Sequence, residues 1–211
     1  MKNCEVKFYQ MLNNGFKSFL VKNEYDAFGE TDFFKWREDL SITIIFCLID
    51  EIGYRFGEKL KFKIYGHIYS TQFDKIITNN QDLVLPDRIG YLYSVSDKFF
   101  SEDGYIIDET TNIEIATSEI INTLNSVNLF FETIKSTDDL VDKMILENYF
   151  HKYIEIIKFL IINNKNQKLA MFLKEIYNKF RESDKWMDLE KKINRVLSKK
   201  LNKSIMEIIF E

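Results

Sequence analysis

Apolar and polar residues alternate most clearly in Lys59–Ser70. One set of alternating positions is apolar or glycine: Leu60, Phe62, Ile64, Gly66 and Ile68. The other set is made of cations and aromatic residues: Lys59, Lys61, Lys63, Tyr65, His67 and Tyr69. Because successive side chains of a strand point to opposite faces, this pattern predicts a half-buried antiparallel strand with an apolar inner face. Its outer face has the strongest binding character in the sequence.

Further strands are predicted on both sides of this one. Asp32–Arg37 is one candidate, and 41–49 is a second whose two faces are both apolar, as in a central strand covered on both sides. Short strands are also expected within 88–94 and 104–108. We expect a short helix over 4–14 that stops at Gly15, then an extended segment over 16–21 and a turn over 23–31.

Helical spacing dominates the rest of the chain. Thr71–Thr78 fits one or two helical turns, and apolar residues recur at steps of three and four from Ile113 to Val127 or Phe131. After residue 135 the pattern is wholly helical, with a break expected near His151 and tight connections between the segments. The sequence therefore predicts an α+β domain over 1–134, with an antiparallel sheet and flanking helices, followed by a C-terminal α-helical bundle over 135–211.

Charge is distributed unevenly along the 211 residues, whose formal net charge is −4. Through Ile134 there are 13 Lys and Arg against 21 Asp and Glu, whereas the remainder has 16 against 12. This asymmetry favours two modules with different surfaces and argues against a general nucleic-acid binder. No membrane-spanning stretch or signal-peptide core occurs, so a cytoplasmic location is expected. The abundance of Asn, Ile and Lys suggests a bacterial origin.

Residues for catalysis and metal binding are sparse. The two histidines, His67 and His151, are far apart, and neither belongs to a metal-ligand spacing. His67 has two interpretations: a binding or acid–base residue, or an ordinary exposed histidine of a strand. Cys4 and Cys47 are interpreted as a free thiol near a terminus and a buried core thiol. Phosphate-binding glycine loops and nucleophile elbows are absent. We therefore expect a protein that is not an enzyme and that uses no cofactor or metal.

Acidic residues cluster over 97–119, among them Glu102, Asp103, Asp108 and Glu109. They could form a solvated surface, hold a hard cation such as Mg²⁺, or face a basic protein partner. Basic residues concentrate in the last long helical segment: Lys185, Lys191, Lys192, Arg195, Lys199, Lys200 and Lys203. This segment could contact RNA, DNA or another anionic surface, or simply be the solvated side of a bundle helix.

The order of these features resembles the bacterial domain of unknown function numbered 4304. The resemblance covers about residues 1–145 and depends on short motifs: Gly-Phe-Lys at 15–17, the aromatic strand 33–37, the apolar strand 42–48, the strand Phe-Lys-Ile-Tyr-Gly-His-Ile at 62–68, Arg-Ile-Gly-x-Leu at 88–92 and Leu-Phe-Phe-Glu at 129–132. The chain departs from that family by lacking a proline before Phe130 and by its helical extension. The resemblance implies an α+β domain with an antiparallel sheet, supplies no catalytic residues, and suggests an immunity-like role by analogy.

Three functions follow as hypotheses. The first is a protein-binding module, immunity- or antitoxin-like in its narrower form, that uses the acidic cluster or the outer strand face with Lys61, Lys63, Tyr65, His67 and Tyr69. The second is an enzyme for a phosphorylated or nucleotide substrate, with Arg88 and the same cations lining a pocket. The third, and the least expected given the acidic first part, is nucleic-acid binding by the basic last helix.

Overall fold

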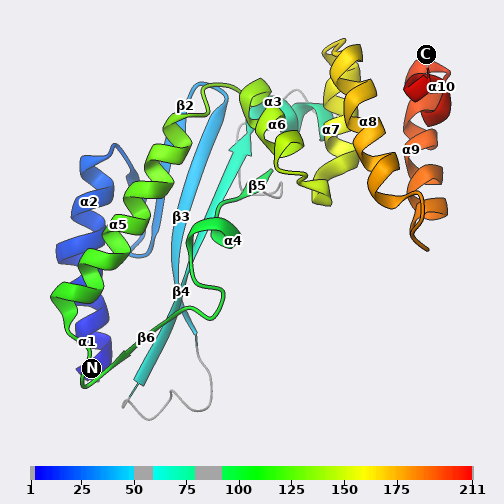
Figure 1. The fold of residues 1–211 in the computed structure, drawn as a ribbon. Helices are drawn as coiled ribbons and strands as arrows, with labels where there is room; N and C mark the ends of the chain where they lie inside the picture. The colour runs from blue at the N-terminus through cyan, green and yellow to red at the C-terminus, as the bar shows by residue number, and fades with distance from the viewer. Residues whose placement is uncertain (1–2, 50–58, 79–91, 211) are drawn as a thin grey trace. The chain divides into compact units, whose positions relative to one another are not determined.

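In the computed structural model, Lys59–Ser70 forms the long strand β4, paired with β3 (Leu40–Ile49) along almost its whole length. β2 (Asp32–Arg37) and β1 (Asp26–Phe28) extend the sheet on the far side of β3, while β5 (Tyr93–Ser94) and β6 (Tyr105–Asp108) pair with opposite halves of β4. Every pairing is antiparallel. The predicted α+β class is confirmed (Figure 1).

The structure describes residues 3–49, 59–78 and 92–210, and these belong to two compact units. The first unit contains the sheet and comprises Met1–Ser70 and Arg88–Thr137, whereas the second contains Thr71–Asp87 and Asp138–Glu211. The predicted boundary at 134 assigned Thr71–Thr78 to the first domain, but these residues group with the C-terminal helices.

One face of the sheet is covered by helices of the first unit. These are α1 (Asn3–Gln10), a π-helical segment (Met11–Phe16), α2 (Lys17–Lys22) and α5 (Ile113–Glu132), seen together on one side of the sheet in Figure 1. The ring of Phe16 stacks on that of Phe46 with 5.0 Å between centroids. Phe62 and Ile64 are buried on the same face, so the predicted apolar side of β4 is the core side.

The N-terminal helix does not stop at Gly15, so the predicted extended segment over 16–21 is wrong. Gly15 has no positive φ, which a helix-ending glycine usually adopts, and the chain stays helical through Lys22. A Cβ at this position would overlap the methyl group of Thr117 on α5. Gly15 therefore allows two helices to pack closely.

Two other local predictions need correction. Asp26–Phe28 is the edge strand β1 and not part of a turn, because it pairs with β2 at Asp26–Phe34 and Phe28–Asp32. Within the predicted strand 88–94, β5 comprises only Tyr93 and Ser94, and residues 88–91 lie outside the described part of the chain. α4 (Ser96–Phe99) follows β5.

Two cations of β2 point to the buried face of the sheet. The Lys35 ammonium is 2.7 Å from a Glu132 carboxylate oxygen, and Arg37 pairs with the other oxygen of Glu132. Arg37 also donates hydrogen bonds to the carbonyls of Phe131 and Ile134. Because the last carbonyls of a helix lack partners within it, these contacts fasten the end of α5 to the sheet.

The second unit is a group of helices around α7 (Tyr153–Ile162). α3 (Thr71–Thr78) packs on α7 with Phe73 stacked on Phe159 at 5.4 Å. The break predicted near His151 is confirmed, since a 3₁₀ turn (Phe150–Lys152) separates α7 from α6. The remaining helices are α6 (Thr137–Leu146), α8 (Asn166–Phe180), α9 (Trp186–Leu201) and α10 (Ile205–Phe210).

The last residues of both segments of the first unit are hydrogen-bonded to each other. The hydroxyl oxygens of Ser70 and Thr137 lie 2.5 Å apart, and both side chains are buried. The Thr137 hydroxyl also donates to Asp39. The two positions at which the chain leaves the first unit are thus held together by buried hydroxyl groups.

Candidate functional site

The face of the sheet opposite the helices is here called the outer sheet face. Strand register places its residues in rows, because directly paired residues lie on the same face. Trp36, Ser41 and Tyr69 form one row, and the next rows contain Phe34, Thr43 and His67, then Phe28, Asp32, Ile45 and Tyr65. Lys63 and Lys61 continue the face along β4, with Ile106 of β6 beside Lys61.

Several large apolar side chains on the outer sheet face are exposed. Phe28 is 71% exposed, Ile106 50% and Trp36 44%. The outer-face residues of β4 are half-buried: Lys61, Lys63, Tyr65, His67 and Tyr69. Tyr65 stacks on His67 with 6.3 Å between centroids, and Phe34 contacts Trp36 edge to face at the same separation. This face therefore carries aromatic residues on β1, β2 and β4, with Ser41, Thr43 and Ile45 of β3 between them and cations at one end.

The structure brings together five predicted site residues and adds others. Lys61, Lys63, Tyr65, His67 and Tyr69 share the outer sheet face as expected, whereas Arg88 lies outside the described residues. Sequence reasoning missed four aromatic or apolar members of this face: Phe28, Phe34, Trp36 and Ile106. The alternation within Asp32–Arg37 places Phe34 and Trp36 on one face, but only strand register shows which face it is.

The predicted acidic cluster does not form a single surface. Glu102 and Asp103 are exposed before β6, while Glu109 is exposed beyond its other end. Hydrogen bonds from the Thr110 and Thr111 hydroxyls hold the pKa of the Asp108 carboxyl below its usual range. The ammonium of Lys7 also binds the backbone carbonyls of Asp108 and Glu109, at 2.9 and 2.8 Å. Asp108 thus shapes the loop after β6.

Metal-ligating residues do not gather in the described part of the chain, where no group of three His, Cys, Asp or Glu could hold an ion. The two cysteines also differ from expectation. Cys4 is buried in the helical layer, whereas Cys47 is half-buried on the outer sheet face. Cys47 lies opposite Lys63, an outer-face position that the two-sided apolar pattern of its strand could not indicate.

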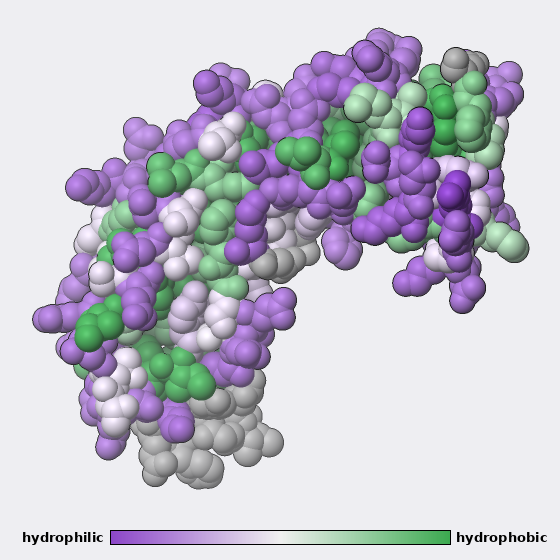
Figure 2. All heavy atoms as spheres, in the orientation of Figure 1, coloured by the Kyte–Doolittle hydropathy of each residue, from purple (hydrophilic) through white to green (hydrophobic). Residues whose placement is uncertain are grey.

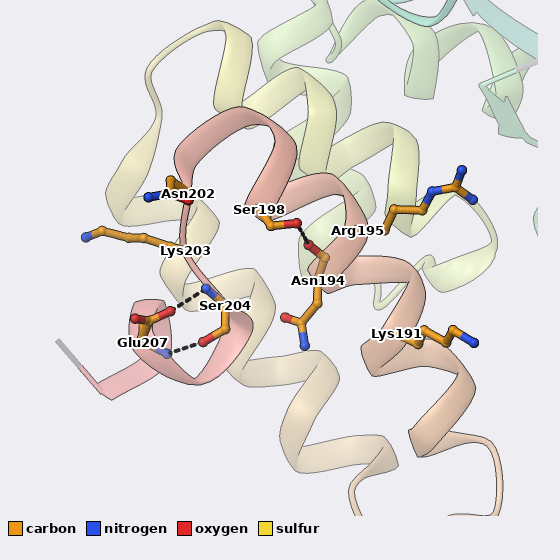
Figure 3. Close-up of a pocket in the computed structure, with 8 residues that line it drawn as sticks. All are labelled: Lys191, Asn194, Arg195, Ser198, Asn202, Lys203, Ser204 and Glu207. Atoms are coloured by element: carbon orange, nitrogen blue, oxygen red, sulfur yellow. Dashed lines mark hydrogen bonds between the residues drawn. The ribbon is translucent and has the colours of Figure 1, made fainter.

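A polar groove lies in the second unit where α9 turns into α10. It encloses about 500 Å³ and is lined by Lys191, Asn194, Arg195, Ser198, Asn202, Lys203, Ser204 and Glu207. Figure 3 shows Lys191 and Arg195 extending from one side of α9, whereas Lys203 extends the opposite way. The charged ends diverge, so the groove does not surround a compact anion.

A smaller cavity in the first unit is mainly apolar. It encloses about 200 Å³ between β6 and α5 and is lined by Met11, Phe62, Tyr105, Ile106, Ile107, Ala116, Glu119, Ile120 and Thr123. Neither this cavity nor the α9–α10 groove includes Lys61, Lys63, Tyr65 or His67. The pocket that an enzyme would need around those residues is therefore not one of these two.

The exposed side of α5 offers a comparison within the first unit. Ile115 and Leu129 are each 58% exposed there, but the helix also exposes Glu119 and Asn122 between them. Hydrophobic and hydrophilic side chains are correspondingly mixed over α5 in Figure 2. Scattered exposed apolar residues of this kind are normal on protein surfaces. The outer sheet face differs because its aromatic residues occupy adjacent rows.

Comparisons with protein-family models, with curated proteins and with solved structures found no match to this chain. The resemblance to the family numbered 4304 therefore stays a prediction. Among the described residues, no helix is both long and apolar enough to cross a membrane.

Proposed function

We propose that the chain is a protein-binding module and that the outer sheet face is its binding surface. The observation that carries this proposal is the exposure of Trp36 and Phe28 on the same face as Tyr65, His67 and Tyr69. Tryptophan and tyrosine dominate the energetics of protein interfaces, because they bury a large area and lose little conformational entropy.

Charge identifies the kind of partner. Lys61 and Lys63 lie on the outer sheet face beside the aromatic rows, and Lys59 continues the same side of β4 toward its exposed end. A complementary protein would present an apolar centre with carboxylates at one edge, since matched potentials favour encounter and orientation.

An immunity- or antitoxin-like role is the narrower form of this proposal. It derives less support from the acidic cluster, because those acids are separated.

The enzyme alternative and the cytoplasmic location stay predictions. An enzyme acting on a phosphorylated substrate would need converging cations, but the known positions of Lys61 and Lys63 are on a sheet face and outside both cavities. We therefore favour binding over catalysis.

Site-specific cross-linking in native cells tests the proposal. A photoreactive phenylalanine analogue replaces Trp36, and in a matched variant it replaces Leu129, which is similarly exposed on α5 of the same unit. We expect a discrete adduct with one other protein at position 36 and none at 129. The identified partner, once purified, should bind a Trp36→Ala variant at least about tenfold more weakly, while Leu129→Ala binds normally.

Two outcomes would refute this function. Equal labelling from both positions would show that the outer sheet face has no particular partner. An adduct between two copies of this chain would replace the heterologous partner with self-association. Substituting both Lys61 and Lys63 by Glu should slow association with the identified partner, and an unchanged rate would remove the proposed charge complementarity.

A further inference from the structure

The second half of α9 and the turn after it are unusually basic. Residues 191–203 contain Lys191, Lys192, Arg195, Lys199, Lys200 and Lys203, and no Asp or Glu occurs in this interval. Of these cations, five are exposed and Lys203 is half-buried. Such a run can be an ordinary solvated helix face or a surface that binds an anionic partner. The number of its cations that are paired with carboxylates helps to distinguish the two.

In the part of the chain that the structure describes, four of these cations have no carboxylate beside them. Within the described residues, no acidic oxygen lies within 4.0 Å of the charged groups of Lys191, Arg195, Lys199 and Lys200, named here the cationic row. Three other lysines of the second unit are paired: Lys168 with Asp142 at 2.5 Å, Lys165 with Asp138 at 3.1 Å and Lys192 with Asp188 at 2.6 Å. The cationic row is therefore a local concentration of uncompensated positive charge.

The packing of α9 directs Lys191, Arg195 and Lys199 of the cationic row outward. Ile193 and Leu197 are fully buried, so the opposite side of the helix faces solvent. Lys191, Arg195 and Lys199 are spaced four residues apart, which places successive charges about 6 Å apart along the helix axis. Figure 3 shows the first two side chains extending in parallel from α9. Lys191, Arg195 and Lys199 thus form a line, whereas Lys200 lies about 100° further around the helix, and the four charges do not converge on one point.

The surroundings of the cationic row discriminate between classes of anionic partner. No large apolar side chain is exposed over 191–203, and Met187, one turn before Lys191 on the same side of α9, is 81% exposed; a membrane-surface helix or a protein interface would require several such residues. Asn194 and Asn202 line the adjoining groove and have amide groups that can donate hydrogen bonds, whereas the Ser198 hydroxyl donates to the Asn194 carbonyl and Glu207 adds a carboxylate to the groove. Lysine, arginine, serine and asparagine are the side chains that contact phosphates in nucleic-acid complexes.

We propose that the cationic row of α9 binds the phosphate backbone of a nucleic acid, without reading its sequence. This activity goes beyond protein binding by the outer sheet face and uses a different unit. The formal net charge of −4 made nucleic acid the least expected partner, but exposed charges act locally because salt screens them beyond about 10 Å. The linear arrangement fits an extended polyanion better than a compact phosphorylated ligand.

Fluorescence anisotropy with the full chain tests this inference. The probes are a labelled 24-base-pair DNA duplex and a labelled single-stranded RNA of mixed sequence. We expect binding at 50 mM salt that weakens by about 10²-fold at 200 mM for the duplex, as release of counterions by about four contacts requires. Phosphatidylserine vesicles serve as an anionic surface without nucleic acid.

Matched variants assign the binding to α9. Replacing Lys191, Arg195, Lys199 and Lys200 by Gln should weaken binding at least about 30-fold. Gln at the dispersed exposed or half-buried positions Lys17, Lys22, Lys75 and Lys174 removes the same net charge and should change binding less than about threefold. Replacing the three lysines of the cationic row by Arg should preserve binding of the nucleic acid. Absence of binding at 50 mM salt, equal loss in both Gln variants, or binding only to vesicles would overturn the proposal.

Discussion

Lys35 is a charged side chain on the buried face of a sheet, only 7% exposed, and it depends on the carboxylate beside it. Glu132 joins this ammonium to the guanidinium of Arg37 and so links the end of α5 to two side chains of β2. A buried ion pair adds little net stability over a well-packed apolar pair, but removing one partner leaves an uncompensated charge. The cluster is therefore best assessed by the stability that is lost when one of its charged partners is removed.

Replacing Glu132 by Gln should lower the free energy of unfolding by about 1–3 kcal/mol, because Lys35 would keep its charge and lose its closer carboxylate, leaving the more distant Glu24 at 3.7 Å. Urea denaturation at pH 7 measures this loss. Glu119→Gln, an exposed substitution on the same helix, is the control and should change stability by less than about 0.5 kcal/mol. A Glu132 variant as stable as the control would show that the cluster contributes nothing.

The loss of stability caused by Glu132→Gln should also depend on pH. The hydrogen bond from Lys35 holds the pKa of Glu132 below its ordinary value of 4.5, with smaller contributions from the charges of Lys35 and Arg37. A depressed carboxyl pKa stabilises the folded state above the unfolded-state pKa, and this stability is lost as the pH falls through the folded-state value. The difference between wild type and Glu132→Gln should therefore shrink below pH 4.5. A constant difference from pH 7 to pH 3 would contradict this account.

At the scale of elements, the N-terminal helical layer depends on one close contact. Gly15 lies in the π-helical segment where it faces Thr117 of α5, and a side chain there would occupy the space of the threonine methyl. Helices approach most closely where at least one residue is small. The π-helical geometry and the glycine together set how α5 lies on the N-terminal helices.

Gly15→Ala should therefore destabilise the protein by about 1–3 kcal/mol through overpacking, although alanine is the better helix former by about 1 kcal/mol. A second substitution, Thr117→Ala, removes the overlapping methyl and should recover part of the loss in a double-mutant cycle of thermal unfolding. Additive effects of the two changes, or stabilisation by Gly15→Ala alone, would show that the contact is not limiting.

The elements that could be predicted are those whose own pattern determines their burial. The sequence predicts β4 from alternation, β3 from a run that is apolar on both faces, and α5 from its apolar spacing, because these patterns extend over many residues. The continuation of the helix through Gly15 could not be predicted, since glycine after Asn13 and Asn14 also fits a helix stop. Only packing against α5 distinguishes a helix that ends at Gly15 from one that continues. β1 has three residues, all exposed, and is a strand because β2 pairs with it.

For the whole molecule, the main departure from the predicted organisation is α3. This helix follows β4 directly, yet its buried Phe73 stacks on Phe159 in the second unit. A break in composition could not show this, because α3 lies in the middle of the sequence that forms the sheet. The outer sheet face shows the same limit: β4 supplied five of its residues, but Phe28, Trp36 and Ile106 join them only through strand pairing.

Phe73→Ala should destabilise the second unit selectively. Removing a buried phenylalanine costs about 3–5 kcal/mol, and the ring contacts α7. Hydrogen exchange followed by mass spectrometry should show faster exchange in α7 and α8, with little change in β3 and β4. As a control, Met171→Ala on the exposed side of α8 should leave both units unchanged. Faster exchange of the sheet to the same degree would mean that the two units unfold together.

The place of α3 in the chain also affects synthesis. A ribosome produces Phe73 well before Phe159, and at about 5–20 residues per second the interval between them lasts about 4–17 seconds. During that time β2, β3 and β4 can already pair, whereas α3 has to remain without its core contact in the nascent chain. The apolar side of α3 is thus a segment that a chaperone could bind before the C-terminal helices are complete.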